Sequence, residues 1–128
     1  MKRPDFERDG WCLDDGEERH RESPETFEIP GSDVRTILQP GDFAKLIFRI
    51  ALEDSESYER MWVIVRERTV GGYLGMLNNL PDTISENEVL WLGTELPFEP
   101  RHIIDVQHAN DESIALAAQP APIPWNRT

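Results

Sequence analysis

The sequence is poor in the residues that most cofactor chemistry uses. It has one cysteine, Cys12, which excludes an intramolecular disulfide, a CxxC redox pair and a cysteine-based zinc cluster. Of its three histidines, His102 and His108 stand six residues apart. That is not the i, i+4 spacing that places two metal ligands on one helical face. We therefore expect no metal ion and no cofactor.

Positive charge is also scarce. The chain has 13 Lys and Arg against 25 Asp and Glu, a formal net charge of -12. This sign repels phosphate backbones and anionic lipid surfaces, so we expect binding neither to nucleic acid nor to a membrane. A basic partner protein is electrostatically favoured.

Long hydrophobic runs are absent. Met61–Val65 is typical of the apolar runs present, which fall far short of the ~20 residues that a membrane helix needs. The positive charges near residue 1 are not followed by an apolar stretch, so we predict no signal peptide and a cytoplasmic location.

The chain is nevertheless long enough for a core of its own. It has 128 residues, of which 38% are hydrophobic and 30% charged, as in an ordinary globular domain. We predict a charged N-terminal helical extension packed on the core (1–31), a β-rich core domain (32–109) and a C-terminal tail (110–128) with a short helix followed by a proline-rich segment.

Two short helices are predicted before the core. In residues 13–22 acids precede bases, which suits the helix dipole, and Asp14 or Asp15 is a suitable N-cap. In residues 32–38 the apolar residues recur at i, i+3 and i+4, which predicts one apolar helical face. That face consists of Val34, Ile37 and Leu38.

The strongest strand patterns lie in residues 43–52 and 59–68. The first alternates between an apolar and a mixed face, and the short polar connection predicts antiparallel pairing with the second. In the second, both faces are apolar at the centre, because Trp62 and Ile64 oppose three other apolar residues. We read it as a central strand covered on both sides, with Trp62 in the core.

Glycine and proline set the limits of the next elements. Gly71-Gly72 predicts a hairpin turn, and Gly75 predicts a bulge inside a strand over 73–79. Pro97 restricts the strand over 94–98 to an edge or a strand end.

The last third of the chain is less regular. Residues 89–92 fit either a strand or a buried loop, while 99–102 predict one turn of 3₁₀ helix and 103–106 a last strand. Residues 111–119 predict a short helix capped by Asp111, and 120–125 an extended, proline-rich segment. The sum predicts an α+β fold: a small, strongly curled antiparallel sheet or SH3-like barrel of about five strands, with short N-terminal helices.

Four pieces of the chain resemble a known family. PGDFAKLIF, ERMWVIV, GYLGMLNN and PFEPRHIIDV stand in this order between Leu13 and Val106. In these pieces the chain resembles the bacterial domain-of-unknown-function family twenty-three fourteen. That family has no established activity, so the resemblance implies no catalytic residues. Some related small bacterial domains resemble immunity proteins, which implies an interaction role.

Candidate catalytic groups are few. His102 with Asp105 has the residue types of a base and its orienting carboxylate, but no nucleophile can be named beside them. His102 also fits a turn residue that bonds the backbone. Cys12 precedes two acids, which raise the pKa of a thiol and make it a poor nucleophile. GGYLG is neither a P-loop nor a dinucleotide fingerprint.

An acidic interaction surface is the better candidate. An exposed tryptophan among carboxylates would anchor a basic partner. The predicted binding residues are Glu53, Asp54, Glu56, Glu86, Glu88 and Trp91. The opposing interpretation is that Trp91 closes the barrel end and Trp125 lies back on the sheet.

We therefore expect a small, non-enzymatic, cytoplasmic binding domain, of immunity type if the partner is a basic toxin. One alternative is an accessory or oligomeric domain that buries Trp91 or the proline-rich tail. The other is a small enzyme that uses His102. The sequence predicts neither the partner nor the oligomeric state.

Overall fold

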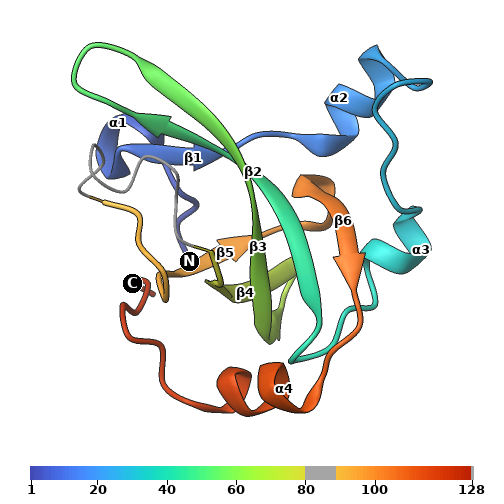
Figure 1. The fold of residues 1–128 in the computed structure, drawn as a ribbon, viewed down its shortest axis with the longest axis vertical. Helices are drawn as coiled ribbons and strands as arrows, with labels where there is room; N and C mark the ends of the chain where they lie inside the picture. The colour runs from blue at the N-terminus through green and yellow to red at the C-terminus, as the bar shows by residue number, and fades with distance from the viewer. Residues whose placement is uncertain (80–88, 128) are drawn as a thin grey trace.

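The computed structural model describes residues 1–79 and 89–127 (Figure 1). Its elements, in chain order, are α1 (Phe6–Asp9), β1 (Trp11–Leu13), α2 (Gly16–Glu22), α3 (Ser32–Arg35), β2 (Phe43–Ala51), β3 (Glu56–Thr69), β4 (Gly72–Leu77), β5 (Glu95–Phe98), the 3₁₀ helix η1 (Pro100–His102), β6 (Ile103–Gln107) and α4 (Asp111–Ala118).

These strands form one strongly curled antiparallel sheet. The order is β1-β2-β3-β4-β5, and β6 also pairs with β2. β6 lies opposite 43–46 of β2 and β1 opposite 48–50, so the two short strands share one edge of β2. The chain passes from β5 to β6 through η1, which brings the two ends of the sheet towards each other as a half-barrel. The predicted small α+β, SH3-like fold is confirmed.

The core lies on the inner face of this sheet. The inward positions of β2 (Leu46, Phe48 and Ile50) are all 0% exposed, as the alternation predicts. A second, smaller cluster lies on the outer face, where α4 covers Ile64. This second cluster explains why the middle of β3 is apolar on both faces.

Trp62 is not a core residue, and that prediction is wrong. Its side chain is half-buried on the outer face. There it meets the ring of Phe43 edge-on, with 6.5 Å between centroids, and the Lys45 ammonium 5.5 Å from its ring. α4 covers the neighbouring Ile64 and not Trp62. Alternation along β3 therefore predicts which face of the sheet a side chain lies on, but not whether another element covers it there.

The tryptophan that does fill the core comes from β1, which the sequence did not predict. Trp11 is 2% exposed, and its ring centroid lies 5.7 Å from that of Phe48. A three-residue strand is too short to show alternation, so only its pairing with β2 defines it. The segment 1–31 therefore contributes a strand to the sheet.

The bulge predicted at Gly75 lies on the partner strand. The register between β3 and β4 shifts between Val65 and Glu67, so the extra residue is Arg66. Gly75 stands opposite Val65 and has another role. A Cβ atom there would lie 2.8 Å from Cε1 of Phe98 and 2.9 Å from the Ile64 oxygen, so only glycine fits.

Two local predictions are also corrected, and of the two alternatives for 89–92 the structure has the loop. The second helix is only Ser32–Arg35; Val34 and Ile37 are exposed, and only Leu38 is buried. The chain leaves the helix there because the Tyr73 hydroxyl accepts a bond from Leu38 N (3.2 Å) and donates one to the Arg35 oxygen (2.6 Å). The N-cap of α4 is Asn110, whose side chain accepts from Ser113 N, so Asp111 is the first helical residue. Residues 89–93 form a loop in which Leu90 is buried.

Two matched tryptophan variants test this assignment. We expect Trp11→Ala to lower the free energy of unfolding by about 3–5 kcal/mol, the range for removing a buried large aromatic side chain. Trp62→Ala is expected to cost only about 1–2 kcal/mol, because less apolar area leaves water there. Urea titration followed by circular dichroism measures both. Equal losses, or the reverse order, would contradict the burial described here.

Candidate functional site

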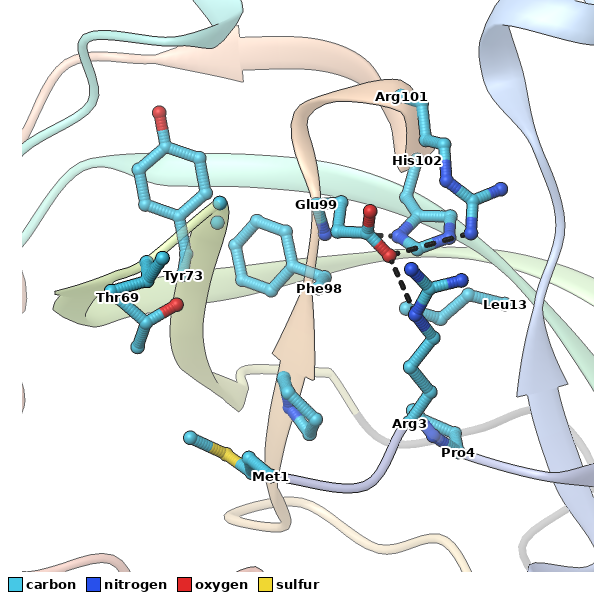
Figure 2. A pocket seen from close by; sticks show the side chains of 14 residues that line it. Met1, Arg3, Pro4, Leu13, Thr69, Tyr73, Phe98, Glu99, Arg101 and His102 are labelled. Atoms are coloured by element: carbon cyan, nitrogen blue, oxygen red, sulfur yellow. Dashed lines mark hydrogen bonds and ion pairs between the residues drawn. The ribbon is translucent and has the colours of Figure 1, made fainter.

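A cavity lies at one end of the half-barrel (Figure 2). Its volume is about 720 Å³. The turn between β3 and β4, the end of β5, η1 and the first residues of the chain surround it. The aromatic rings of Tyr73 and Phe98, 5.3 Å apart, lie on one side, and the charged side chains gather on the other (Figure 2).

The charged groups of this cavity neutralise one another. One oxygen of Glu99 accepts from Arg3 Nε at 3.0 Å and from Arg101 Nη2 at 3.3 Å. Arg101 also pairs with Asp15, with 3.0 Å between Nη1 and Oδ2. The guanidinium groups of Arg3 and Arg101 are thus both paired with carboxylates of the same chain.

His102 acts as a turn residue, as one of the two interpretations predicted. It is 5% exposed, and its Nδ1 accepts a hydrogen bond from the Glu99 N–H at 3.0 Å. Burial, with a smaller effect from the Arg101 charge, lowers the pKa of His102 to about 4. The ring is therefore neutral at pH 7, and its proton resides on Nε2.

The structure does not bring His102 and Asp105 together as base and orienting carboxylate. Asp105 is exposed on β6, and its Oδ1 accepts from Val106 N at 2.9 Å. The described residues that line the cavity include no cysteine, serine or lysine. The hydroxyl groups that line it are those of Thr69 and Tyr73, and the Tyr73 hydroxyl donates to the Arg35 oxygen.

Cys12 is also a poor nucleophile in this setting. It lies half-buried in β1, and burial, more than any nearby charge, raises the pKa of its thiol. The direction agrees with the sequence prediction, but desolvation outweighs the acidic neighbours as its cause.

The predicted binding residues are spread over two regions. Glu53 and Asp54 are exposed in the turn between β2 and β3. Glu56 belongs to β3 rather than to that turn, and its Oε2 pairs with Arg49 Nη2 at 2.6 Å. The two remaining predicted acids, Glu86 and Glu88, lie outside the described residues.

Trp91 is 36% exposed in the loop before β5, next to Leu92, which is also exposed. Another residue of this loop, Val89, would lie 3.1 Å from a Cβ atom on Gly10. The Gly10 oxygen accepts from Ala51 N at 2.8 Å, so the loop reaches the same end of the sheet as the β2–β3 turn. Within the described residues, however, no hydrogen bond or ion pair joins Trp91 to Glu53 or Asp54.

Sequence reasoning missed a polar recess of about 590 Å³ on α2. Its acidic lining residues are Asp14, Asp15, Glu18 and Glu22. The Arg19 guanidinium of α2 lies 5.5 Å from the ring centre of Tyr58 on β3. The Arg60 guanidinium of β3 lies 5.2 Å from the ring centre of Phe27, in the segment that follows the helix. The acids of α2 were visible in the sequence, but their place beside β3 was not.

We call the exposed acids of α2, Glu18 and Glu22, together with those of the hairpin turn, Glu53 and Asp54, the acidic face. Tyr58, 51% exposed, projects from β3 between the turn and the α2 contact. None of these four carboxylates forms an ion pair with a described residue.

No family model, no curated protein and no solved structure matches the chain. The resemblance to the family of unknown function therefore stays a prediction. None of the helices described is long and apolar enough to cross a membrane. In the same residues no group of three or more His, Cys, Asp or Glu side chains is placed to hold a metal ion.

The lowered pKa of His102 predicts a pH dependence. The unfolded state takes up the proton near pH 6.5 and the folded state only near 4, so stability falls as the pH drops through this window. The loss attributable to His102 is at most about 3 kcal/mol. His102→Asn, whose amide oxygen can still accept from the Glu99 N–H, should flatten that part of the pH profile.

The measurement is the free energy of unfolding in urea between pH 7.5 and 4. His108→Asn, at an exposed histidine, is the matched control and should follow the wild-type profile. If His102→Asn retains the full wild-type slope, His102 does not carry this pH dependence.

Proposed function

We propose that this chain is a binding domain for a basic protein and that the acidic face is its contact surface. The observation that carries the proposal is that most arginines are paired within the chain, while the acids of the acidic face are not. Eight arginines form ion pairs with the chain's own carboxylates. The acids of the acidic face are left exposed to solvent.

The internal pairs surround this face without neutralising it. Arg35, 7% exposed, pairs with Glu17 on α2, and Arg101 pairs with Asp15 at the start of that helix. These pairs fix α2 against α3 and η1, while Glu18 and Glu22 remain available. A fixed set of like charges produces a local field that raises the association rate of a basic partner.

Tyr58 gives the face an anchor that charge alone lacks. Tyrosine is enriched among the residues that carry most of the binding energy at protein interfaces. Here the ring is 51% exposed, with the Arg19 guanidinium of α2 5.5 Å from its centre, and a partner's apolar or basic side chain can pack against its exposed part. A basic toxin held inactive by this domain is one partner of this kind.

The accessory or oligomeric alternative rests on the exposed Trp91 and Leu92. It stays a prediction that light scattering can test. The enzyme alternative has no comparable support, because His102 is engaged in the turn at η1.

The proposal predicts salt-sensitive capture that depends on the acidic face. The wild-type chain, Glu18→Lys/Glu22→Lys and the control Asp105→Lys/Glu112→Lys are used in turn to capture proteins from the native cell's lysate. Both double variants change the net charge by the same amount, and all four positions are exposed. We expect a basic protein bound by the wild type and the control at low salt, at least tenfold less by the α2 variant, and released at high salt.

Circular dichroism confirms that each variant is folded. Capture that survives high salt, or that falls equally in both double variants, would refute the acidic face as the contact surface. In the second case only the total charge would matter.

A further inference from the structure

The C-terminal segment 119–127 lies along the outer edge of β5 instead of forming part of the sheet. It continues from α4 and returns to the first residues of the chain (Figure 1). A single parallel bridge, Thr94 to Ile123, joins it to the strand edge. In this bridge Glu95 N donates to the Ile123 oxygen at 2.8 Å, and Ile123 N to the Gly93 oxygen at 3.4 Å.

Proline explains why this pairing stops after one bridge. Pro120, Pro122 and Pro124 have no N–H, so the segment is extended and cannot continue a ladder. β5 pairs with β4 along its other edge. Side chains, rather than a ladder, hold the segment in place.

The first of these is Trp125. Its ring meets that of Trp11 edge-on, with centroids 5.9 Å apart. Its indole N–H donates to the Lys2 oxygen at 3.0 Å, and its backbone N–H donates to Glu95 Oε1 at 3.0 Å. Trp125 thus makes a ring contact with Trp11 and two hydrogen bonds, to the Lys2 oxygen and to Glu95 Oε1.

The second is Arg127. Its Nη2 lies 2.6 Å from Glu67 Oε2 and 3.4 Å from Glu95 Oε2. The hydrogen bond from Arg127, more than the nearby charges, lowers the pKa of Glu67. A cation two residues after the aromatic residue therefore reaches two carboxylates.

The buried groups that the segment contacts belong to the sheet. Glu95 is a carboxylate with a 2% exposed side chain, and its one partner from the sheet is Arg66 at the β3 bulge. Its other donors, Trp125 N and Arg127, both come from the segment. Arg66 itself keeps a buried Nε with no partner among the described residues. A buried charge is costly unless it is hydrogen-bonded, so the N–H donors and the guanidinium of the segment stabilise Glu95 beyond its pair with Arg66.

We propose that the outer edge of β5 is a peptide-binding site, and that segment 119–127 occupies it until an extended segment of a partner protein takes its place. The partner segment has a proline-rich start, an aromatic residue and, two residues later, a lysine or arginine. Backbone pairing to a strand edge supplies affinity, and the aromatic and basic side chains supply specificity. The site is separate from the acidic face, and neither proposal depends on the other.

The test uses the full chain and a fluorescein-labelled peptide of sequence QPAPIPWNR, which is residues 119–127 supplied in trans. In the wild type the attached segment competes at a high effective concentration, so the peptide binds weakly. Trp125→Ala/Arg127→Gln loosens the attached segment, and we expect the peptide to bind at least tenfold more tightly by fluorescence polarisation. Ile37→Ala/Arg8→Gln, which removes an exposed apolar residue and an exposed arginine elsewhere, should behave as the wild type.

Specificity is tested on both partners. In the loosened chain, Glu67→Gln and a peptide with glutamine in place of its arginine should each weaken binding several-fold, and together no more than either alone. Arg127→Gln alone, at a half-exposed position, serves if the double variant does not fold. Equal peptide affinity for wild-type and loosened chains, or equal binding of a scrambled peptide, would overturn the proposal. So would a dimer of the loosened chain by light scattering, since a second copy would then be the occupant.

Discussion

The antiparallel pairing of β2 with β3 is the constraint on which the rest of the fold depends. Nine residue pairs, from Phe43–Ile64 to Ala51–Glu56, join the two strands. β1 and β6 divide the remaining edge of β2, and β4 followed by β5 extends from β3. A one-residue slip in this register would turn the inner apolar residues of β2 outward, so the core and the register require each other.

The bulge at Arg66 connects this framework to the surface. An extra residue in β3 increases the local twist and bends the sheet, which helps it to curl. It also directs Arg66 to Glu95 on β5 and to the Gln119 oxygen that follows α4. The bulge at Arg66 thus contributes to the curvature of the sheet and places a buried ion pair between β3 and β5. Through the Gln119 oxygen it also holds the start of the C-terminal segment.

Charge in this protein is divided between structure and surface. Arginine is committed to carboxylates of the same chain, as at Glu99, where two guanidinium groups share one oxygen. Other carboxylates, among them Glu18, Glu22, Glu53 and Asp54, are exposed and form no ion pair with a described residue. The two arginines that line the cavity beside His102 are likewise paired, Arg3 with Glu99 and Arg101 with Glu99 and Asp15.

The sequence by itself determined what depends on short-range pattern. Alternation located β2 and β3, and Gly71-Gly72 located the turn between β3 and β4. The sequence also limited the N-cap of α2 to Asp14 or Asp15, of which the structure has Asp15, because each signal is contained in a few adjacent residues. Only the tertiary structure decided the rest. The core tryptophan is Trp11 and not Trp62. The bulge lies at Arg66 and not at Gly75. Trp125 contacts Trp11, and Arg127 pairs with Glu67. These outcomes depend on which strand or segment lies opposite, and contacts between residues as far apart as 67 and 127 leave no periodic trace in the sequence.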